Sequence, residues 1–431
     1  MSLHLLFFYI TILLLPTQLG LHFWPEWSFI VGRRIDYLAP TFFLTDITVF
    51  FIFLSLLIQT KLRIIQHVWK NKIMVLSLGG LVIFACINSF LATSPQAALF
   101  AWLKVLESLF ISWYIIRIKP SLPASLSLFS IAIIYSSSIA LAQSILQHSI
   151  NGLLWFIGER SFTLSTPGIA KTYLDFSFVP FLSQISRLPS QLTLRPYATF
   201  PHPNVLGGFI AVILPLIITN KVTSKRYIFL RYSASILGFV ALVLTFSKTA
   251  IIAFCIGLFL LTLKAYRSRK ISIIMIACIF LVLLGAYIKF SSTTTLEESI
   301  EDRVSLQTSA MKIFTLSPII GVGLNNFLIH LPEVTTARKI FFIQPVHSVY
   351  ILLISEIGIV GVLLLLVAVT KFILLWKNKK NDRMTFILGI ACTEILFLGL
   401  FDHYLLTTQQ GRLLMSVIFG FFLSHLIRKT K

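Results

Sequence analysis

The sequence predicts an all-α integral membrane protein with about twelve transmembrane helices. Of its 431 residues, 57% are hydrophobic and only 12% are charged, whereas about 25% of the residues in soluble domains are charged. So little charge cannot cover the surface of soluble domains of this total length. Apolar runs of roughly 20 residues can instead cross a bilayer as helices. These proportions exclude a soluble enzyme, a disordered chain and a disulfide-stapled scaffold.

Twelve apolar runs have the composition of membrane-spanning helices. They are 3–19, 39–59, 73–93, 97–116, 121–147, 204–220, 232–246, 249–263, 271–289, 347–376, 384–401 and 413–427. Between them, two segments exceed the usual length of a connecting loop and are expected to carry function. The chain is therefore divided into helices one to five (1–147), a first outer loop (148–203), helices six to nine (204–289), a second, helical outer loop (290–346) and helices ten to twelve (347–431).

The basic residues predict how the chain is oriented in the membrane. An even number of spans puts both termini on one side, together with the connections 60–72, 117–120, 221–231, 264–270, 377–383 and 428–431. These short connections hold 21 of the 36 Lys and Arg residues and a single acid, Asp382. Because basic loops stay in the cytoplasm, both termini are expected there. The same pattern accounts for the net charge of +21, so no nucleic-acid partner is expected.

Ionisable groups at the outer membrane face are the candidates for function. The first are Arg195 and His202, in the stretch Arg195-Pro-Tyr-Ala-Thr-Phe-Pro-His-Pro-Asn204 before the sixth span. Two prolines bracket His202 and predict a fixed, non-helical turn. The alternatives are that Arg195 is an interfacial anchor and that His202 only forms a hydrogen bond within its turn.

Lys248 lies at the tip of the predicted hairpin 232–263, in Thr245-Phe-Ser-Lys-Thr249. About 16 residues are available for each leg, or roughly 24 Å, which is less than the hydrocarbon core of about 30 Å. The tip is therefore expected slightly below the outer surface, with Lys248 partly desolvated. The alternative is a lysine that extends to the interface.

Arg303 is expected on a helix near 296–316 in the second outer loop. Thr295 and Glu298 have the spacing of a capping box, which predicts a helix start. Apolar residues then recur at helical spacing: Ile300, Val304, Met311 and Phe314. No acid lies three or four residues from Arg303, so the usual pairing on a helix surface is not available. After this helix comes a glycine-rich turn, Gly321-Val-Gly-Leu-Asn-Asn-Phe327, which alone is a weak signal for phosphate binding.

His347 lies at the outer start of the tenth span, in Gln344-Pro-Val-His-Ser-Val-Tyr350. An imidazole titrates near neutral pH and can take a proton from a hydroxyl group, although a single histidine at a membrane edge is often structural. Glu356 lies two to three turns deeper and is expected to form bonds within the bundle. Lys104 and Glu107, three apart in the fourth span, are expected to neutralise each other as a structural pair.

Together these motifs resemble the O-antigen ligase and O-antigen polymerase superfamily over roughly 195–365. The resemblance rests on the order of five elements: Arg-x4-Phe-x-His-Pro-Asn from Arg195, the hairpin Ser247-Lys248, Arg303 followed by Ser317-Pro-Ile-Ile-Gly-Val-Gly-Leu-Asn-Asn-Phe327, Pro345-Val-His-Ser-Val-Tyr350, and Ser355-Glu-Ile-Gly-Ile-Val-Gly361. There is one departure, because the family usually has Ser-Arg where this chain has Ser247-Lys248.

The resemblance implies a multi-span glycosyltransferase of the bacterial cytoplasmic membrane. Such an enzyme moves a glycan from an undecaprenyl-diphosphate carrier to an acceptor hydroxyl at the outer face, and the acceptor is a glycan, a lipid or a protein. His347 is then the expected base. Cations that stabilise the diphosphate are expected from Arg195, Lys248 and Arg303. Supporting roles are expected for His202, Asn204 and Glu356.

No metal or other cofactor is expected, since neither outer loop contains the Asp-x-Asp pattern that holds a nucleotide sugar through a divalent ion. Whether the enzyme is a ligase or a polymerase stays open. A transporter or flippase of lipid-linked glycan is the alternative function. Transporters usually contain internal repeats, and residues 1–150 do not repeat the Arg195–Asn204 or His347 motifs, which favours the enzyme.

Overall fold

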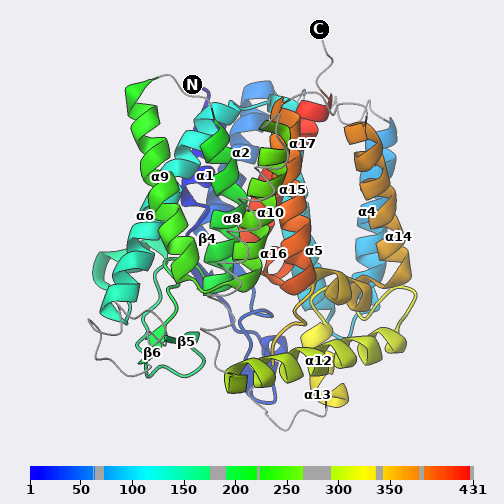
Figure 1. The fold of residues 1–431 in the computed structure, drawn as a ribbon. Coiled ribbons are helices and arrows are strands. Elements are labelled where there is room, and N and C mark those ends of the chain that lie inside the picture. The colour runs from blue at the N-terminus through cyan, green and yellow to red at the C-terminus, as the bar shows by residue number, and fades with distance from the viewer. Residues whose placement is uncertain are drawn as a thin grey trace.

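The computed structural model describes residues 1–61, 63, 72–174, 191–220, 224–265, 293–335, 343–377 and 383–427. These residues are mostly helical, and the long helices form a bundle (Figure 1). The helices that overlap predicted spans are α1 (Leu3–Leu14), α2 (Leu44–Thr60), α4 (Lys72–Phe90), α5 (Pro95–Ile118), α6 (Leu122–Leu146), α8 (Pro203–Thr219), α9 (Lys225–Leu244), α10 (Lys248–Ala265), α14 (Val349–Lys377), α15 (Arg383–Phe401) and α17 (Gln409–Ile427).

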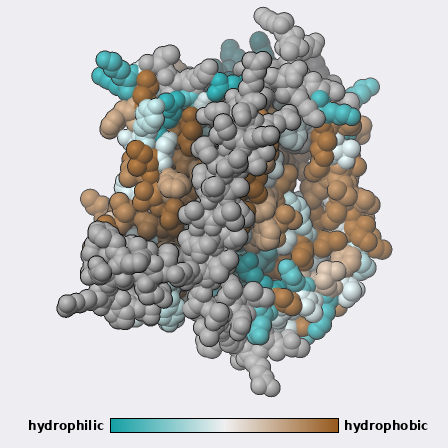
Figure 2. Space-filling view, in the orientation of Figure 1, coloured by the Kyte–Doolittle hydropathy of each residue, from teal (hydrophilic) through white to brown (hydrophobic). Residues whose placement is uncertain are grey.

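The structure identifies an integral membrane protein. Among the described helices, α5, α6, α9, α14, α15 and α17 are long and apolar enough to cross a bilayer, and five shorter apolar helices accompany them. Among the coloured residues of Figure 2, hydrophobic side chains predominate at mid-height on both sides, and hydrophilic ones are more frequent toward the top and the bottom. The ninth predicted span, 271–289, lies outside the described residues, so the count of twelve stays a prediction.

Helix α12 and several short elements gather at one end of the bundle, away from the N-terminus and from the end of α17 (Figure 1). They include α12 (Thr293–Leu316), α13 (Phe327–Val334), and the antiparallel strands β5 (Lys171–Leu174) and β6 (Gln191–Leu194), in which Lys171 pairs with Leu194. The remaining short elements are β1 (Gly20–His22), η1 (Glu26–Ser28), β2 (Phe29–Ile30), β3 (Arg33–Arg34), β4 (Thr41–Phe43), η2 (Gly152–Ile157) and α16 (Tyr404–Thr407). Strand β1 pairs with β4 and β2 with β3, both antiparallel.

Helix α8 occupies the centre of the bundle and is buried along nearly its whole length. It contacts α6, α9, α10 and α15. Two glycines near its N-terminal end permit a very close approach of neighbouring segments. A Cβ atom on Gly207 would lie 3.0 Å from the Cβ of Ala250 on α10, and one on Gly208 would lie 1.8 Å from the Tyr404 hydroxyl. The start of α8 is thereby held against both the α9–α10 hairpin and α16.

Helix α12 confirms the helix predicted at 296–316. Its buried residues Leu306, Ala310 and Ile313 pack in one cluster with residues of α13 and α14. Val304 and Met311, which belong to the predicted apolar stripe, are 54% and 51% exposed. At a membrane surface an exposed side chain can contact lipid, so apolar residues do not by themselves mark the face that packs on the protein.

A buried polar network joins α2, α5 and α17 beneath the outer end of the bundle. The predicted pair is confirmed, because Lys104 Nζ lies 3.3 Å from Glu107 Oε2, and Lys104 also bonds to Asp46 of α2. The amide of Gln409 on α17 donates to Asp46 Oδ1 at 2.5 Å and to Glu107 Oε1 at 3.2 Å. Arg412 in turn donates to Gln409 Oε1 at 3.2 Å. The charges therefore compensate one another.

Replacing Lys104 should destabilise the protein strongly, because it leaves two buried carboxylates without their shared cation. Removing one partner of a buried ion pair typically costs about 3–5 kcal/mol of unfolding free energy. We expect a loss of this order for Lys104→Met, measured by denaturant unfolding of the purified protein in detergent. The control is Lys312→Met, at an exposed position of α12. An equal, small effect of both substitutions would contradict the structural role of the network.

Candidate active site

A buried aspartate, Asp402, brings three helix ends together. It follows directly after α15 and is 5% exposed. Its Oδ2 accepts a hydrogen bond of 3.0 Å from Asn204 Nδ2 at the start of α8, and its Oδ1 accepts one of 2.8 Å from the backbone N–H of His403. His347 Nδ1 lies 3.8 Å from the same Oδ1. The starts of α8, α14 and α16 therefore meet at one carboxylate.

Arg195 connects this carboxylate to the α9–α10 hairpin. Its Nη2 donates to Asn204 Oδ1 at 2.7 Å, and its Nε donates to the backbone oxygen of Thr245 at 2.7 Å. Because the Asn204 amide accepts from Arg195 and donates to Asp402, both ends of the amide are fixed. Arg195 is thus more than an interfacial anchor, since it positions Asn204 and the tip of the hairpin.

The turn that carries these groups is held rigidly, as its two prolines predict. His202 is the N-cap residue of α8, and its Nδ1 accepts a hydrogen bond of 3.1 Å from the Asn204 N–H. Pro203 then occupies the first helical position, where its missing N–H costs nothing. From α6, Gln143 Oε1 accepts from the backbone N–H groups of Tyr197 and Ala198 at 3.0 and 2.8 Å. The sequence analysis did not identify Gln143.

The electrostatics of the site keep its aspartate charged and two of its histidines neutral. Burial alone would raise the pKa of the Asp402 carboxyl, but the imidazoles of His347, His403 and His202 hold it well below its ordinary value. Burial lowers the pKa of His202 to about 3 and of His403 to about 4. His403 is also fixed by a 2.8 Å hydrogen bond between its Nδ1 and the Thr407 hydroxyl.

Arg303 of helix α12 acts electrostatically on the same site. Burial lowers the pKa of Arg195 to about 10, and the positive charge of Arg303 contributes in the same direction. The positive charge of Arg303 also contributes to lowering the pKa of His403. Two predicted cations, Arg195 and Arg303, are therefore close enough to the Asp402 cluster to act on it electrostatically.

Lys248 is adjacent to the site in the chain, and the protein does not bury it. It begins α10, three residues after the Thr245 carbonyl that binds Arg195, and its side chain is exposed. The hairpin legs are longer than the 16 residues expected. Helix α9 begins at Lys225 and has 20 residues, and α10 has 18. At 1.5 Å per residue these legs are about 30 and 27 Å long. The position of Lys248 below the membrane surface stays a prediction.

Glu356 supports a neighbouring segment instead of the Asp402 cluster. It is buried in α14, and its Oε1 accepts a 3.2 Å hydrogen bond from the N–H of Phe327, the first residue of α13. Its backbone oxygen accepts from the Asn88 side chain and from the N–H of Gly323, both at 3.0 Å. As predicted, Glu356 bonds within the protein, where it holds the glycine-rich turn.

His347, Asp402 and His403 have ligand atoms within 4.8 Å of one another and could in principle hold a metal ion. Arg195 and Arg303 act on the same cluster, and two permanent positive charges oppose a divalent cation there. The arrangement is better suited to an anionic ligand beside a histidine base. His347 Nδ1 is buried and has no hydrogen-bond partner within the described part of the chain.

Asp402 and His403 were missed from the sequence, although a signal was present. They stand next to each other between the apolar runs 384–401 and 413–427, at the outer membrane face. An acid beside a histidine at such a place is costly unless it has partners. This short connection lies outside the two long loops in which functional residues were expected.

The two neutral histidines should make stability depend on pH. In the unfolded chain an imidazole has a pKa near 6.5, whereas His202 and His403 have folded values of about 3 and 4. Below pH 6.5 the unfolded state therefore binds more protons, so stability is complete above that pH and is lost as pH falls toward 4. At pH 5 each of the two histidines should lower the free energy of unfolding by about 2 kcal/mol.

We expect the melting temperature to fall between pH 7 and 5, and we expect the substitution His403→Gln to weaken this dependence on pH. The exposed His22→Gln serves as the control, and an unchanged slope in His403→Gln would contradict a buried neutral His403.

Comparison with known proteins agrees with the motifs. A sequence model of the O-antigen ligase family matches residues 233–366, a segment that contains Lys248, Arg303, His347 and Glu356. No curated protein sequence matches the chain. The resemblance drawn from the motifs is thereby confirmed, and residues 233–366 of this chain are identified as an O-antigen ligase family region.

Proposed function

We propose that this chain is a glycosyltransferase that moves a glycan from an undecaprenyl-diphosphate carrier to an acceptor hydroxyl at the outer face of the bacterial cytoplasmic membrane. One observation carries the proposal. The His347 imidazole lies 3.8 Å from a buried, ionised Asp402, beside Arg195 and Arg303. An O-antigen ligase family region contains this histidine, and that family transfers glycans. The reaction needs no metal.

In the proposed mechanism His347 is the general base. The Asp402 carboxylate attracts a proton on His347 Nδ1, and this tautomer leaves the Nε2 lone pair available for the acceptor hydroxyl. As the acceptor oxygen attacks, its proton passes to Nε2, and the positive charge that forms on the ring is stabilised by Asp402. A base that is oriented by a third group is a common arrangement in nucleophilic catalysis.

The leaving group is a diphosphate. A bond forms between the acceptor oxygen and the anomeric carbon, and the bond from that carbon to the phosphate oxygen breaks, with its electron pair going to the phosphate. A single displacement inverts the configuration at the anomeric carbon. The added charge on the phosphate needs fixed cations. We assign this role to Arg303, to Lys248 and to Arg195, whose Nη1 forms no hydrogen bond within the described residues.

The arrangement of the ends supports the proposed orientation. The α12 helix, which carries Arg303, lies at the end of the bundle away from the N-terminus and the end of α17 (Figure 1). Because the basic connections belong to the other side, both termini are cytoplasmic in this proposal. The diphosphate of a donor in the outer leaflet would then meet Arg303 at the membrane surface.

His347→Ala should abolish glycan transfer and leave donor binding within about threefold, because a base that acts on the acceptor contributes mainly in the transition state. Asp402→Asn should slow transfer by about 100-fold or more. Single-turnover rates and donor affinity in detergent measure both effects, with the exposed His22→Ala as control. Normal turnover by His347→Ala would remove this residue from the mechanism. Donor flux across liposomes without any transfer would instead support the flippase alternative.

Arg303→Ala should weaken donor binding and also lower the rate, because contacts between a guanidinium and phosphate exist before and during the reaction. We expect at least a tenfold loss of donor affinity at low salt. Lys312→Ala is the matched control, since it removes a cation nine residues further along α12 at an exposed position. An equal effect of the two substitutions would show that only the net charge of the helix matters.

A further inference from the structure

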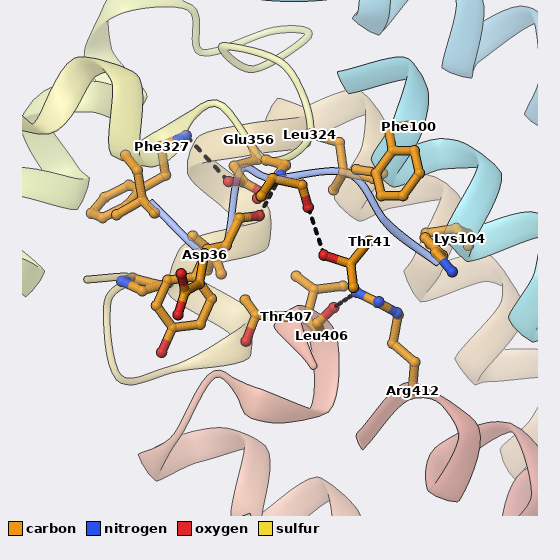
Figure 3. Close-up of a pocket in the computed structure, with 18 of the residues that line it drawn as sticks. Asp36, Thr41, Phe100, Lys104, Leu324, Phe327, Glu356, Leu406, Thr407 and Arg412 are labelled. Carbon is orange, nitrogen blue, oxygen red and sulfur yellow. Dashed lines mark hydrogen bonds between the residues drawn. The ribbon is translucent and has the colours of Figure 1, made fainter. Parts of the chain in front are cut away.

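A cavity of about 80 Å³, lined by both polar and apolar residues, lies beside the Asp402 cluster and plays no part in the mechanism above (Figure 3). Five segments line it: the connection before α2, the outer half of α5, the glycine-rich turn with the start of α13, the first turns of α14 with Pro345, and the α16–α17 link. In the view of Figure 3, Lys104 and Arg412 lie at one side of the cavity and Asp36 at the other.

Two residues belong to both the cavity and the active site. The ring of Tyr37 lies edge-on to that of His403, with centroids 5.4 Å apart, and the Thr407 hydroxyl is 2.8 Å from His403 Nδ1. Both Tyr37 and Thr407 line the cavity. The His403 ring is itself 5.4 Å from that of His347. A group bound in the cavity would therefore lie next to residues that contact His403, one ring away from the proposed base.

The glycine-rich turn forms one wall of the cavity and is not a phosphate loop. A phosphate loop needs backbone N–H groups that point at the ligand, but here these groups bind within the protein. The N–H of Leu324 donates to Asn88 Oδ1 at 2.9 Å, and those of Gly323 and Phe327 donate to the backbone and side chain of Glu356. These bonds keep the wall fixed, with Leu324 and Phe327 lining the cavity.

Asn325 presents a carboxamide to the cavity from a left-handed backbone, with a φ of 62°. Its Nδ2 donates to the backbone oxygen of Tyr37 at 3.0 Å, which joins two walls of the cavity. The other uncharged or acidic polar groups of the lining are the carboxylates of Asp36 and Glu356 and the hydroxyls of Tyr37, Thr41 and Thr407. Aromatic rings complete the lining, among them that of Phe100.

The charges of the lining do not suit a diphosphate. Lys104 is already paired with Asp46 and Glu107, and Arg412 donates to the Leu406 carbonyl at 2.8 Å and to Gln409. A diphosphate binds where cations are available to it. Carboxylate, amide and hydroxyl groups next to aromatic rings match instead a ligand with many hydroxyls and an apolar face. A sugar ring has both.

The volume of the cavity also suits one sugar ring. One buried water needs roughly 10–15 Å³ of cavity volume. The cavity of 80 Å³ therefore corresponds to about five to eight waters. This is the scale of a single ring, and neither an oligosaccharide nor a prenyl chain would fit inside.

We propose that this cavity is the acceptor subsite, which binds the terminal, uncharged sugar ring of the acceptor and presents its hydroxyl to His347. The inference rests on the proposed function, and it adds that the acceptor ends in a sugar instead of an amino-acid side chain. Asn325 and the wall around Ala101 then determine how well the acceptor binds, without contacting the donor.

Binding can be tested without catalysis by saturation-transfer NMR on the full chain in nanodiscs. The probes are the methyl glycosides of glucose, galactose and N-acetylglucosamine. Ala101→Leu fills the cavity from α5 with a residue that favours helices, and Asn325→Gly removes the carboxamide while tolerating the left-handed backbone. We expect Ala101→Leu to reduce the signal of at least one probe fivefold or more, and Asn325→Gly to reduce it too. Ala368→Leu, at an exposed position of α14, is the matched control and should leave it unchanged.

The absence of signal from all three probes in the unsubstituted protein would overturn the assignment, as would an equal signal in Ala101→Leu and Ala368→Leu. Displacement of the glycoside by inorganic diphosphate would show an anion site and would also overturn it. In the transfer assay, both cavity variants should raise the acceptor KM at least tenfold, with donor affinity and kcat within threefold. If the unsubstituted protein binds the glycoside but transfers no glycan, the proposed function fails and the sugar site remains.

Discussion

The site depends on one constraint, the need to compensate the buried charge of Asp402. Removing a carboxylate from water is very costly unless hydrogen bonds and opposite charges surround it. The partners of Asp402 come from different parts of the chain, with Asn204 at the start of α8 and His347 before α14. Arg195 extends the network to the α9–α10 hairpin through Asn204. The hydrogen bonds and charges that compensate this single carboxylate therefore fix the relative position of the segments on which the proposed chemistry relies.

Close packing beneath the cluster keeps this arrangement in place. Gly207 and Gly208 let the first turns of α8 touch α10 and the Tyr404 hydroxyl, where any side chain at Gly208 would collide. Tyr404 follows Asp402 by two residues, so the contact holds the connection that carries the carboxylate. Glu356 has the equivalent role at the glycine-rich turn, where it accepts the first N–H of α13. Small residues and buried polar groups, instead of loop flexibility, thus determine the shape of the outer end.

Much of the fold and of the candidate site could be predicted because bilayer insertion imposes strong rules on composition. The length of the apolar runs predicted where the helices lie. The prolines around His202 predicted the rigid turn that carries Asn204. The length of a hairpin leg was underestimated because α9 continues through basic residues to Lys225. The apolar residues of α12 did not indicate its packed face, because lipid accepts apolar side chains as well as protein does, and Val304 and Met311 are exposed. Asp402 was overlooked because its importance comes from partners that lie far away in the chain.

Charge pairing divides the outer end into two chemically different regions that share His403. On one side Arg195 and Arg303 supply positive charge, and the charge of Arg303 adds to the larger effect of burial in lowering the pKa of His403, which favours an anion such as a diphosphate. On the other side Lys104 and Arg412 lie in a network with Asp46 and Glu107, so their charges are compensated where the cavity begins. An anionic donor group is thereby favoured at the first region and an uncharged ring at the second. His403 lies where the two regions meet, with its ring 5.4 Å from that of His347. In the proposed mechanism His347 then acts on a hydroxyl that the second region presents to a donor bound at the first.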